Sequence, residues 1–123
     1  MLKAAVCAAR FHLRAAPFDV TYRHCADCRR SSAAPVSLFV EVREERFEIT
    51  NGTPAVYPFS PDVQRSFCRD CGTPLSYHAA RHPGERHLLI GNFDQPERFL
   101  LTRHVFTSEA LPGFHVADDL ARR

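Results

Sequence analysis

The sequence contains no tryptophan, one methionine and one lysine, and it has no long hydrophobic run. A membrane-spanning helix needs about 20 consecutive apolar residues, and no stretch of the chain approaches that length. The net charge of +2 is too small to indicate nucleic-acid binding by itself. We therefore expect one globular domain covering residues 1–123, with neither a membrane nor a nucleic acid as partner.

Full disulfide pairing within the chain is also excluded, because the five cysteines are an odd number. Together with their CxxC spacing, this count favours a reducing compartment and predicts a cytoplasmic protein. The first 16 residues have no acidic side chain, as in targeting peptides, but the apolar run Ala4 to Ala9 is short for a signal sequence and ends at Arg10. A first strand is the better interpretation of this segment.

Several catalytic signatures are missing. The sequence has no phosphate-binding loop, no dinucleotide fingerprint and no nucleophile elbow. Its seven histidines are scattered, and a single histidine is more often a surface or core residue than a catalyst. The chemistry must therefore be sought in the cysteines.

The strongest local signal is Cys68-Arg-Asp-Cys71 followed by Gly72, and a second pair, Cys25-Ala-Asp-Cys28, lies upstream. A tight turn can direct both sulfurs of a CxxC at one ion, and Gly72 can take the positive φ that such a turn often needs. Two CxxC pairs are a much stronger metal signal than one, and spacing alone predicts a single site of four cysteines. Buried thiol pairs or a redox-active CxxC are the alternatives.

Short strands separated by turn signals recur along the chain and predict an all-β, mainly antiparallel fold. Asn51-Gly52 predicts a hairpin, and Pro58 places its strand at a sheet edge. Strands flanking Cys68 and Cys71 would carry that pair at a hairpin tip. The expected strands are residues 4–13, 18–22, 35–42, 47–50, 55–59, 63–67, 73–78, 87–91 and 100–106.

Four segments occur in the order typical of one family: residues 24–32 (HCADCRRSS), 65–75 (RSFCRDCGTPL), 93–99 (FDQPERF) and 107–112 (TSEALP). In these the sequence resembles the glutathione-dependent formaldehyde-activating (GFA) enzymes, a group that includes centromere protein V. The resemblance implies a β-tent fold of small antiparallel sheets with zinc-knuckle hairpins. It also implies carbon–sulfur lyase chemistry, the reversible joining of a thiol such as glutathione to an aldehyde such as formaldehyde.

The resemblance implies two zinc sites. A catalytic zinc is held by a Cys-x-Cys-x-x-Cys run, of which Cys25 and Cys28 would be the remaining, catalytic ligands. A structural zinc is held by a Cys-x-Cys on the first strand together with the later pair, here Cys68 and Cys71. A three-ligand zinc leaves a position for a substrate thiol, which would lose its proton there and become the nucleophile.

The sequence departs from this pattern at both sites. Arg23 stands where the first catalytic ligand is expected, and the first strand offers only Cys7, one residue out of step. A one-residue shift on a strand reverses the face of the side chain, so Cys7 can rejoin the site only through a bulge or an alignment gap. We therefore expect between zero and two zinc ions per chain and leave enzymatic activity open.

Arginines near the two pairs form a candidate ligand-binding rim. Arg23 and Arg29 are the candidates for binding a carboxylate of a glutathione-like ligand. The expected partner is thus a small-molecule thiol or a thiol–aldehyde adduct. Two other functions stay open: a non-enzymatic relative that binds a ligand or a protein, and a redox module in which Cys25 and Cys28 cycle between dithiol and disulfide.

Overall fold

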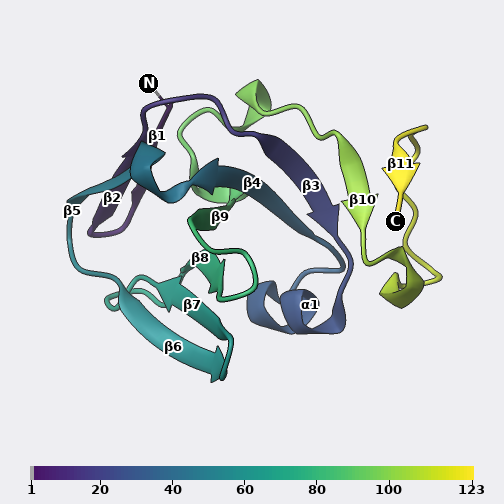
Figure 1. Ribbon diagram of the computed structural model, residues 1–123, viewed down its shortest axis with the longest axis horizontal. Coiled ribbons are helices and arrows are strands. Elements are labelled where there is room, and N and C mark those ends of the chain that lie inside the picture. The colour runs from purple at the N-terminus through teal and green to yellow at the C-terminus, as the bar shows by residue number, and fades with distance from the viewer. Residues whose placement is uncertain (1) are drawn as a thin grey trace.

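A computed structural model describes residues 2–123 as two β-sheets and one short α-helix (Figure 1). The smaller sheet has the strand order β1-β2-β5, and the larger has the order β11-β10-β3-β4-β9-β8-β7-β6. All strand pairs are antiparallel except those of β10 with β3 and with β11. The predicted all-β, mainly antiparallel fold is confirmed. Within the described residues, no helix is long and apolar enough to cross a membrane.

The small sheet contains β1 (Leu2–Val6), β2 (Ala9–Leu13) and β5 (Phe47–Asn51). The large sheet contains β3 (Asp19–Arg23), β4 (Ser37–Arg43), β6 (Ala55–Ser60), β7 (Val63–Phe67), β8 (Pro74–Ala79), β9 (Glu85–Leu89), β10 (Arg103–Val105) and β11 (Ala121–Arg122). The helix is α1 (Ala26–Ser32), and the 3-10 turns are η1 (Glu44–Arg46), η2 (Ile90–Asn92), η3 (Pro96–Arg98) and η4 (Thr107–Glu109).

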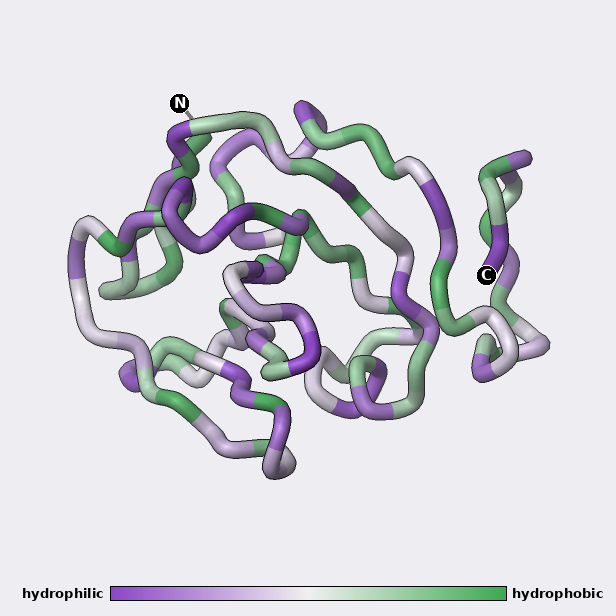
Figure 2. The backbone as a smooth tube through the Cα atoms, viewed as in Figure 1, coloured by the Kyte–Doolittle hydropathy of each residue, from purple (hydrophilic) through white to green (hydrophobic). Residues whose placement is uncertain are grey.

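The main core lies between the inner faces of the two sheets. Buried residues alternate along β2 at Ala9, Phe11 and Leu13, and they pack with Val40 and Val42 of β4. Figure 2 shows the corresponding alternation of hydrophobic and hydrophilic segments along the tube. Full burial of each large apolar side chain stabilises the fold by about 1.5–3 kcal/mol.

The strand β4 is buried on both faces. Val40 and Val42 belong to the main core, whereas Phe39 belongs to a second cluster with Cys28 of α1 and Tyr77 of β8. Because side chains alternate along a strand, Phe39 and Glu41 share the face that is turned away from the main core. The helix α1 covers this second face, below β3 and β4 in Figure 1.

Two local predictions were wrong. Residues 4–13 form two strands rather than one, because Cys7 takes φ 52° and the chain reverses at Cys7-Ala8. Asn51-Gly52 is not a hairpin turn: β5 pairs with β2 and β6 pairs with β7, so these residues cross from one sheet to the other. Phe47 of β5 packs against the main core, and this tertiary packing overrides the local turn signal.

Gly52 is tied to the β1–β2 turn, and we expect Gly52→Ala to destabilise the protein. Gly52 has φ +81°, and an added Cβ would lie 2.8 Å from the carbonyl oxygen of Ala8. Strain of this kind costs about 1–3 kcal/mol, which urea unfolding would measure. Gly113→Ala is the matched control, because nothing lies within 4 Å of its Cβ position. Equal unfolding midpoints for the two variants would contradict the assigned close approach.

Candidate functional site

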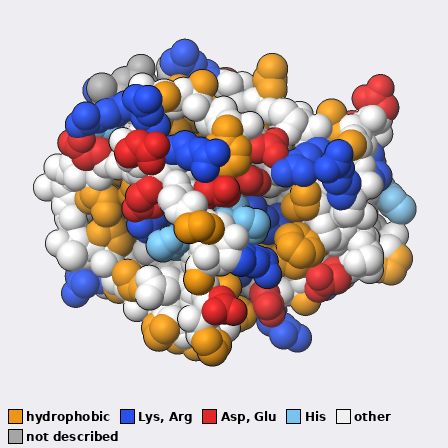
Figure 3. All heavy atoms as spheres, viewed as in Figure 1, with side chains coloured by type: hydrophobic (Ala, Val, Ile, Leu, Met, Phe, Trp, Pro, Cys, Tyr) orange, Lys and Arg blue, Asp and Glu red, His pale blue; other side chains and the backbone are white. Residues whose placement is uncertain are grey.

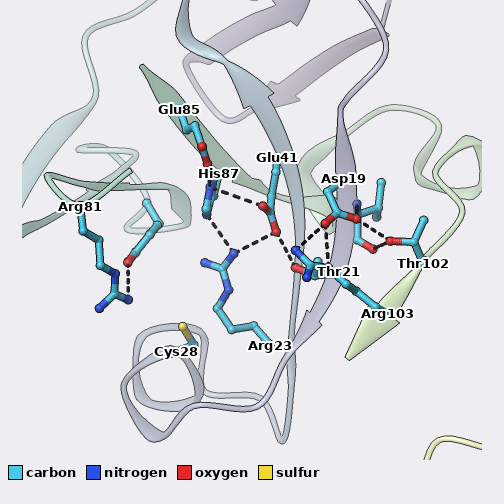
Figure 4. A network of polar contacts seen from close by, with 12 residues as sticks. Asp19, Thr21, Arg23, Cys28, Glu41, Arg81, Glu85, His87, Thr102 and Arg103 are labelled. Atoms are coloured by element: carbon cyan, nitrogen blue, oxygen red, sulfur yellow. Dashed lines mark hydrogen bonds and ion pairs between the residues drawn. The ribbon is translucent and has the colours of Figure 1, made fainter. Parts of the chain in front are cut away.

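A buried polar network lies on the α1 side of the large sheet (Figure 4). Arg23, at the end of β3, is only 5% exposed, and its Nη2 donates to Glu41 Oε2 at 3.2 Å and to His87 Nδ1 at 2.9 Å. Thr21 Oγ1 donates to the same carboxylate oxygen at 2.9 Å. The guanidinium also stacks on Phe39, 4.2 Å from the ring centroid. These contacts fix Arg23 as a permanent buried cation with a paired counter-charge.

His87 remains neutral in this network. Burial, and secondly the charge of Arg23, lower the pKa of His87 to about 3, although Glu41 opposes the shift. Because Nδ1 accepts from Arg23, the proton is on Nε2, which lies 3.1 Å from Glu85 Oε1 and donates to it. Glu41, Glu85 and His87 have donor atoms within 4.8 Å of one another, as a metal site requires. Arg23 already donates to the Glu41 carboxylate and to the His87 ring, and His87 Nε2 carries a proton, so the cation of this cluster is the chain's own guanidinium.

This arrangement predicts a loss of stability with acid. The folded-state pKa of His87 lies below its unfolded value of about 6.5, so the unfolded chain binds the extra proton between pH about 6.5 and about 3. The contribution to stability is complete above a pH of about 6.5 and declines by up to about 1.4 kcal/mol per pH unit as the pH falls toward 3. Unfolding free energies from pH 7 to 4 should fall less steeply for His87→Gln than for the wild type. The exposed His115→Gln should retain the wild-type slope, and identical slopes for all three proteins would rule out this role of His87.

The first cysteine pair lies at the start of α1, not at a hairpin tip. Cys25 is the extended N-cap residue (φ −62°, ψ 147°), Cys28 lies inside the helix, and Ala33 ends it in the left-handed conformation. Cys28 is 2% exposed, and its sulfur is 3.8 Å from Arg65 Nη2. This pair is therefore carried by one helical turn, which places both sulfurs on the side of α1 that faces the sheet.

The two thiols of this pair differ in acidity. A hydrogen bond from Cys25, together with the charges of Arg23 and Arg65, lowers the pKa of Cys28 well below its ordinary value, against the opposing effect of burial. The same hydrogen bond, and secondly burial, raise the pKa of Cys25. Of the two thiols, Cys28 therefore loses its proton more readily than Cys25.

Two cavities meet at Cys28 and Arg65. The larger, of about 750 Å³, is lined by Cys25 and several arginines, and the smaller, of about 300 Å³, extends toward Gly72. In Figure 3, histidine atoms appear near the middle of the face viewed, next to Lys/Arg and Asp/Glu atoms. The arginines that line the larger cavity are Arg23, Arg65, Arg81, Arg103 and Arg123. The cavity is also lined by four acidic residues, Asp27, Glu41, Asp62 and Glu109, so the positive charges exceed the negative ones by one. Its volume and this small excess of positive charge suit a small molecule with a net negative charge.

Two N–H groups at these cavities have no partner. Within residues 2–123, the Nε atoms of Arg23 and Arg65 are buried without a hydrogen-bond acceptor. A buried donor without an acceptor costs about 1–3 kcal/mol. Both guanidinium groups also lie near the ring of Tyr77, with centroid distances of 5.1 and 5.0 Å. The two side chains with unpaired donors therefore both lie beside Tyr77.

The second cysteine pair forms a separate sulfur cluster with Cys7. The sulfurs of Cys7, Cys68 and Cys71 lie within 4.8 Å of one another, where the β1–β2 turn meets the β7–β8 turn. Gly72 has φ +81°, as predicted for the residue after the pair, and its N–H donates to the carbonyl of Cys68 at 2.7 Å. Backbone N–H groups, first that of Cys71 and then that of Asp70, lower the pKa of Cys68 to about 7. This donor set can hold a soft metal ion.

The single site of four cysteines predicted from spacing does not form in the described residues: Cys25 and Cys28 lie apart from the Cys7–Cys68–Cys71 cluster. Cys7 joins the cluster because the chain turns there, which removes the register constraint of a continuous strand. Arg29 donates to the backbone oxygens of His24 and Glu109 and so anchors α1 to η4. The ligand-binding roles of Arg23 and Arg29 stay predictions.

Sequence analysis missed Glu41 and His87, whereas Arg65 belongs to the predicted rim of arginines near the two cysteine pairs. Glu41 gave a signal that could have been used, since it is the only charged residue in the apolar stretch from Val36 to Val42. His87 gave none, because its proximity to the site depends on the pairing of β9 with β4.

Comparison with known proteins identifies the fold and the family. Residues 4–109 match the family model of the glutathione-dependent formaldehyde-activating enzyme. A crystal structure of a Rhodobacter sphaeroides protein is similar over 100% of both chains, with 18% sequence identity and a TM-score of 0.62, which supports the fold. No curated protein matches the sequence. Since the family model covers most of the sequence, the chain belongs to the glutathione-dependent formaldehyde-activating enzyme family.

Proposed function

We propose that this protein carries out reversible thiol–aldehyde chemistry, of the carbon–sulfur lyase type, in the larger cavity beside Cys28. The observation that carries the proposal is the placement of a thiol and two guanidinium groups at one end of a cavity of about 750 Å³. Thiolates are the reactive form of thiols, and adjacent cations favour them. Carboxylates of a glutathione-like thiol would pair with the arginines that line the cavity.

A zinc ion fits the Cys7–Cys68–Cys71 cluster. Three thiols within 4.8 Å of one another are suitable zinc donors, and the exposure of Cys7 and Cys71 leaves room for a fourth ligand. Zinc bound there would cross-link the β1–β2 and β7–β8 turns. We assign this ion a structural role, because neither of the arginines that flank Cys28 belongs to the cluster.

A second zinc ion beside Cys25 and Cys28 does not fit. In the described residues these two thiols have no third cysteine, histidine or carboxylate donor within reach, and zinc needs at least three protein ligands. At the expected first ligand position is Arg23, a buried cation held by Glu41 and His87. The reaction proposed below therefore involves no metal ion at this site.

In the proposed reaction the thiolate sulfur of the bound glutathione-like thiol attacks the carbonyl carbon of the aldehyde. The sulfur–carbon bond forms, the π-electron pair moves to the carbonyl oxygen, and that oxygen takes a proton from water. The reverse sequence releases thiol and aldehyde. Arg65 and Arg23 contribute by electrostatic stabilisation of the thiolate before attack and of the oxyanion after it.

The test compares the rate of adduct formation from glutathione and formaldehyde with and without the protein. We expect an acceleration over the spontaneous reaction, and we expect Arg81→Gln to raise the KM for glutathione about tenfold by removing a cation from the cavity. The exposed Arg46→Gln, away from both cavities, is the charge-matched control. A wild-type rate equal to the spontaneous one would overturn the proposed activity.

A redox function is the second candidate, and the hydrogen bond between the Cys25 and Cys28 thiols favours it. Oxidised glutathione would form a mixed disulfide with one thiol, and attack by the other would yield the intramolecular disulfide and two glutathione thiols. Thiol titration after this treatment should then show a loss of two thiols that Cys25→Ser abolishes. Unchanged titration of the wild type would exclude this candidate.

A further inference from the structure

We propose that the Cys28 thiol is itself a nucleophile that captures aldehydes as a covalent hemithioacetal. The inference takes its ligand class, an aldehyde, from the proposed function, but it assigns the attacking sulfur to the protein rather than to a free thiol. It rests on three features of the structure: the position of the sulfur, the cations around it and the unpaired donors beside them.

The position of Cys28 makes its sulfur reachable only from the cavities. The residue is 2% exposed, yet it lines both cavities, of about 750 and 300 Å³. Figure 4 shows the sulfur on the side of α1 that faces Arg23. Cys28 packs with Phe39 and Tyr77 in the second cluster, but its sulfur also has a guanidinium nitrogen at 3.8 Å, and the residue lines both cavities.

The cations beside the sulfur are fixed before any ligand arrives. Arg23 is held by Glu41 and His87, and Arg65 lies over the rings of Phe59 and Tyr77 at 4.9 and 5.0 Å. Because these cations are already in position, they need not rearrange when negative charge moves during a reaction. They can stabilise charge on the sulfur and then on an oxygen bonded next to it.

The unpaired donors show that neither guanidinium group is fully paired. The Nε–H groups of Arg23 and Arg65 are buried without an acceptor in the described residues. An aldehyde attacked by Cys28 acquires a negatively charged oxygen two bonds from the sulfur. Because the Nε atoms themselves are inaccessible, the two guanidinium groups would stabilise this oxygen through their positive charge.

The chemical step balances without a co-reactant. The Cys28 thiolate forms a sulfur–carbon bond with the carbonyl carbon, the π-electron pair moves to oxygen, and water supplies the proton that completes the hemithioacetal. Nothing is oxidised or reduced, and the reverse step restores the thiol and the aldehyde.

Carbon-13 NMR with labelled formaldehyde and the full-length protein tests the inference. We expect a sulfur-bound hydroxymethyl signal that is absent in Cys28→Ser and retained in Cys71→Ser. Arg65→Met should lower the adduct's equilibrium constant about tenfold, whereas Arg69→Met, an exposed arginine on the adjacent turn, should leave it unchanged. Circular dichroism would verify that the variants fold.

The result that would overturn the inference is a signal that survives in Cys28→Ser, no signal in the wild type, or an equal loss in Arg65→Met and Arg69→Met. If Cys28→Ser does not fold, the comparison of Arg65→Met with Arg69→Met still tests whether the adduct forms beside Arg65. The proposed function can fail separately, because a protein that forms this adduct need not accelerate the reaction of free glutathione with formaldehyde.

Discussion

Protein purified without chelator is expected to contain one zinc ion per chain, and Cys68→Ser is expected to lose it. Cys68 is the buried member of the Cys7–Cys68–Cys71 cluster, so its replacement leaves two exposed thiols, too few for a zinc site. Because metal binding to such a site is coupled to folding, we expect a destabilisation of about 3 kcal/mol or more. For a chain of this size, that lowers the melting temperature by about 10 °C.

Atomic absorption and thermal melting measure the two effects, and Cys25→Ser is the matched control. Cys25 lies on α1, outside the cluster, so its replacement should leave the zinc content at one. Zinc lost from Cys25→Ser but retained in Cys68→Ser would mean that the metal is bound at the other pair. A chelator should reproduce the Cys68→Ser melting temperature in the wild type and have little further effect on the variant.

Glu41→Gln is expected to destabilise the protein by about 3–5 kcal/mol, because it leaves the buried guanidinium of Arg23 without its counter-charge. Both side chains of the ion pair are buried, with exposed fractions of 6% for Arg23 and 8% for Glu41. Its Nη2–Oε2 distance of 3.2 Å allows a charge-assisted hydrogen bond. Denaturant unfolding of the wild type and the variant would measure the difference.

A double variant separates the ion pair from simple packing. Arg23→Met combined with Glu41→Met removes both charges, and buried pairs replaced in this way often lose little stability or even gain some. We therefore expect the double variant to be more stable than Glu41→Gln alone. The control is the exposed neighbour Glu45→Gln, for which a change of less than about 0.5 kcal/mol is expected. Similar losses for Glu41→Gln and Glu45→Gln would show that the pair contributes nothing specific.

The parts of the fold that depend on near neighbours in sequence could be predicted. The hairpin that carries Cys68 and Cys71 is one example, because the CxxC spacing, the following Gly72 and the flanking apolar alternation all lie within about 15 residues. The strand that ends at Arg23 and the edge position of β6 are others. In each, local turn chemistry and strand pattern agree with the tertiary structure.

The parts of the structure that depend on pairing between strands far apart in the sequence could not be predicted. Cys7 was one residue out of step only under the assumption of a continuous strand, and the turn at Cys7-Ala8 had no glycine or asparagine to signal it. Arg23 was identified as a cation at a ligand position, but its partners Glu41 and His87 come from β4 and β9. Only the strand order of the large sheet brings these three side chains together.

The double-sided burial of β4 limits how this family member can diverge. Val40 packs in the main core, and its neighbour Glu41 accepts a hydrogen bond from Arg23 on the opposite face of the strand. Insertion or deletion of one residue within Ser37–Arg43 would exchange these two assignments at once, placing a carboxylate in the apolar interior and a valine beside the guanidinium. Length changes should therefore be confined to exposed connections such as residues 111–115, while β4 accepts only replacements that suit both of its faces.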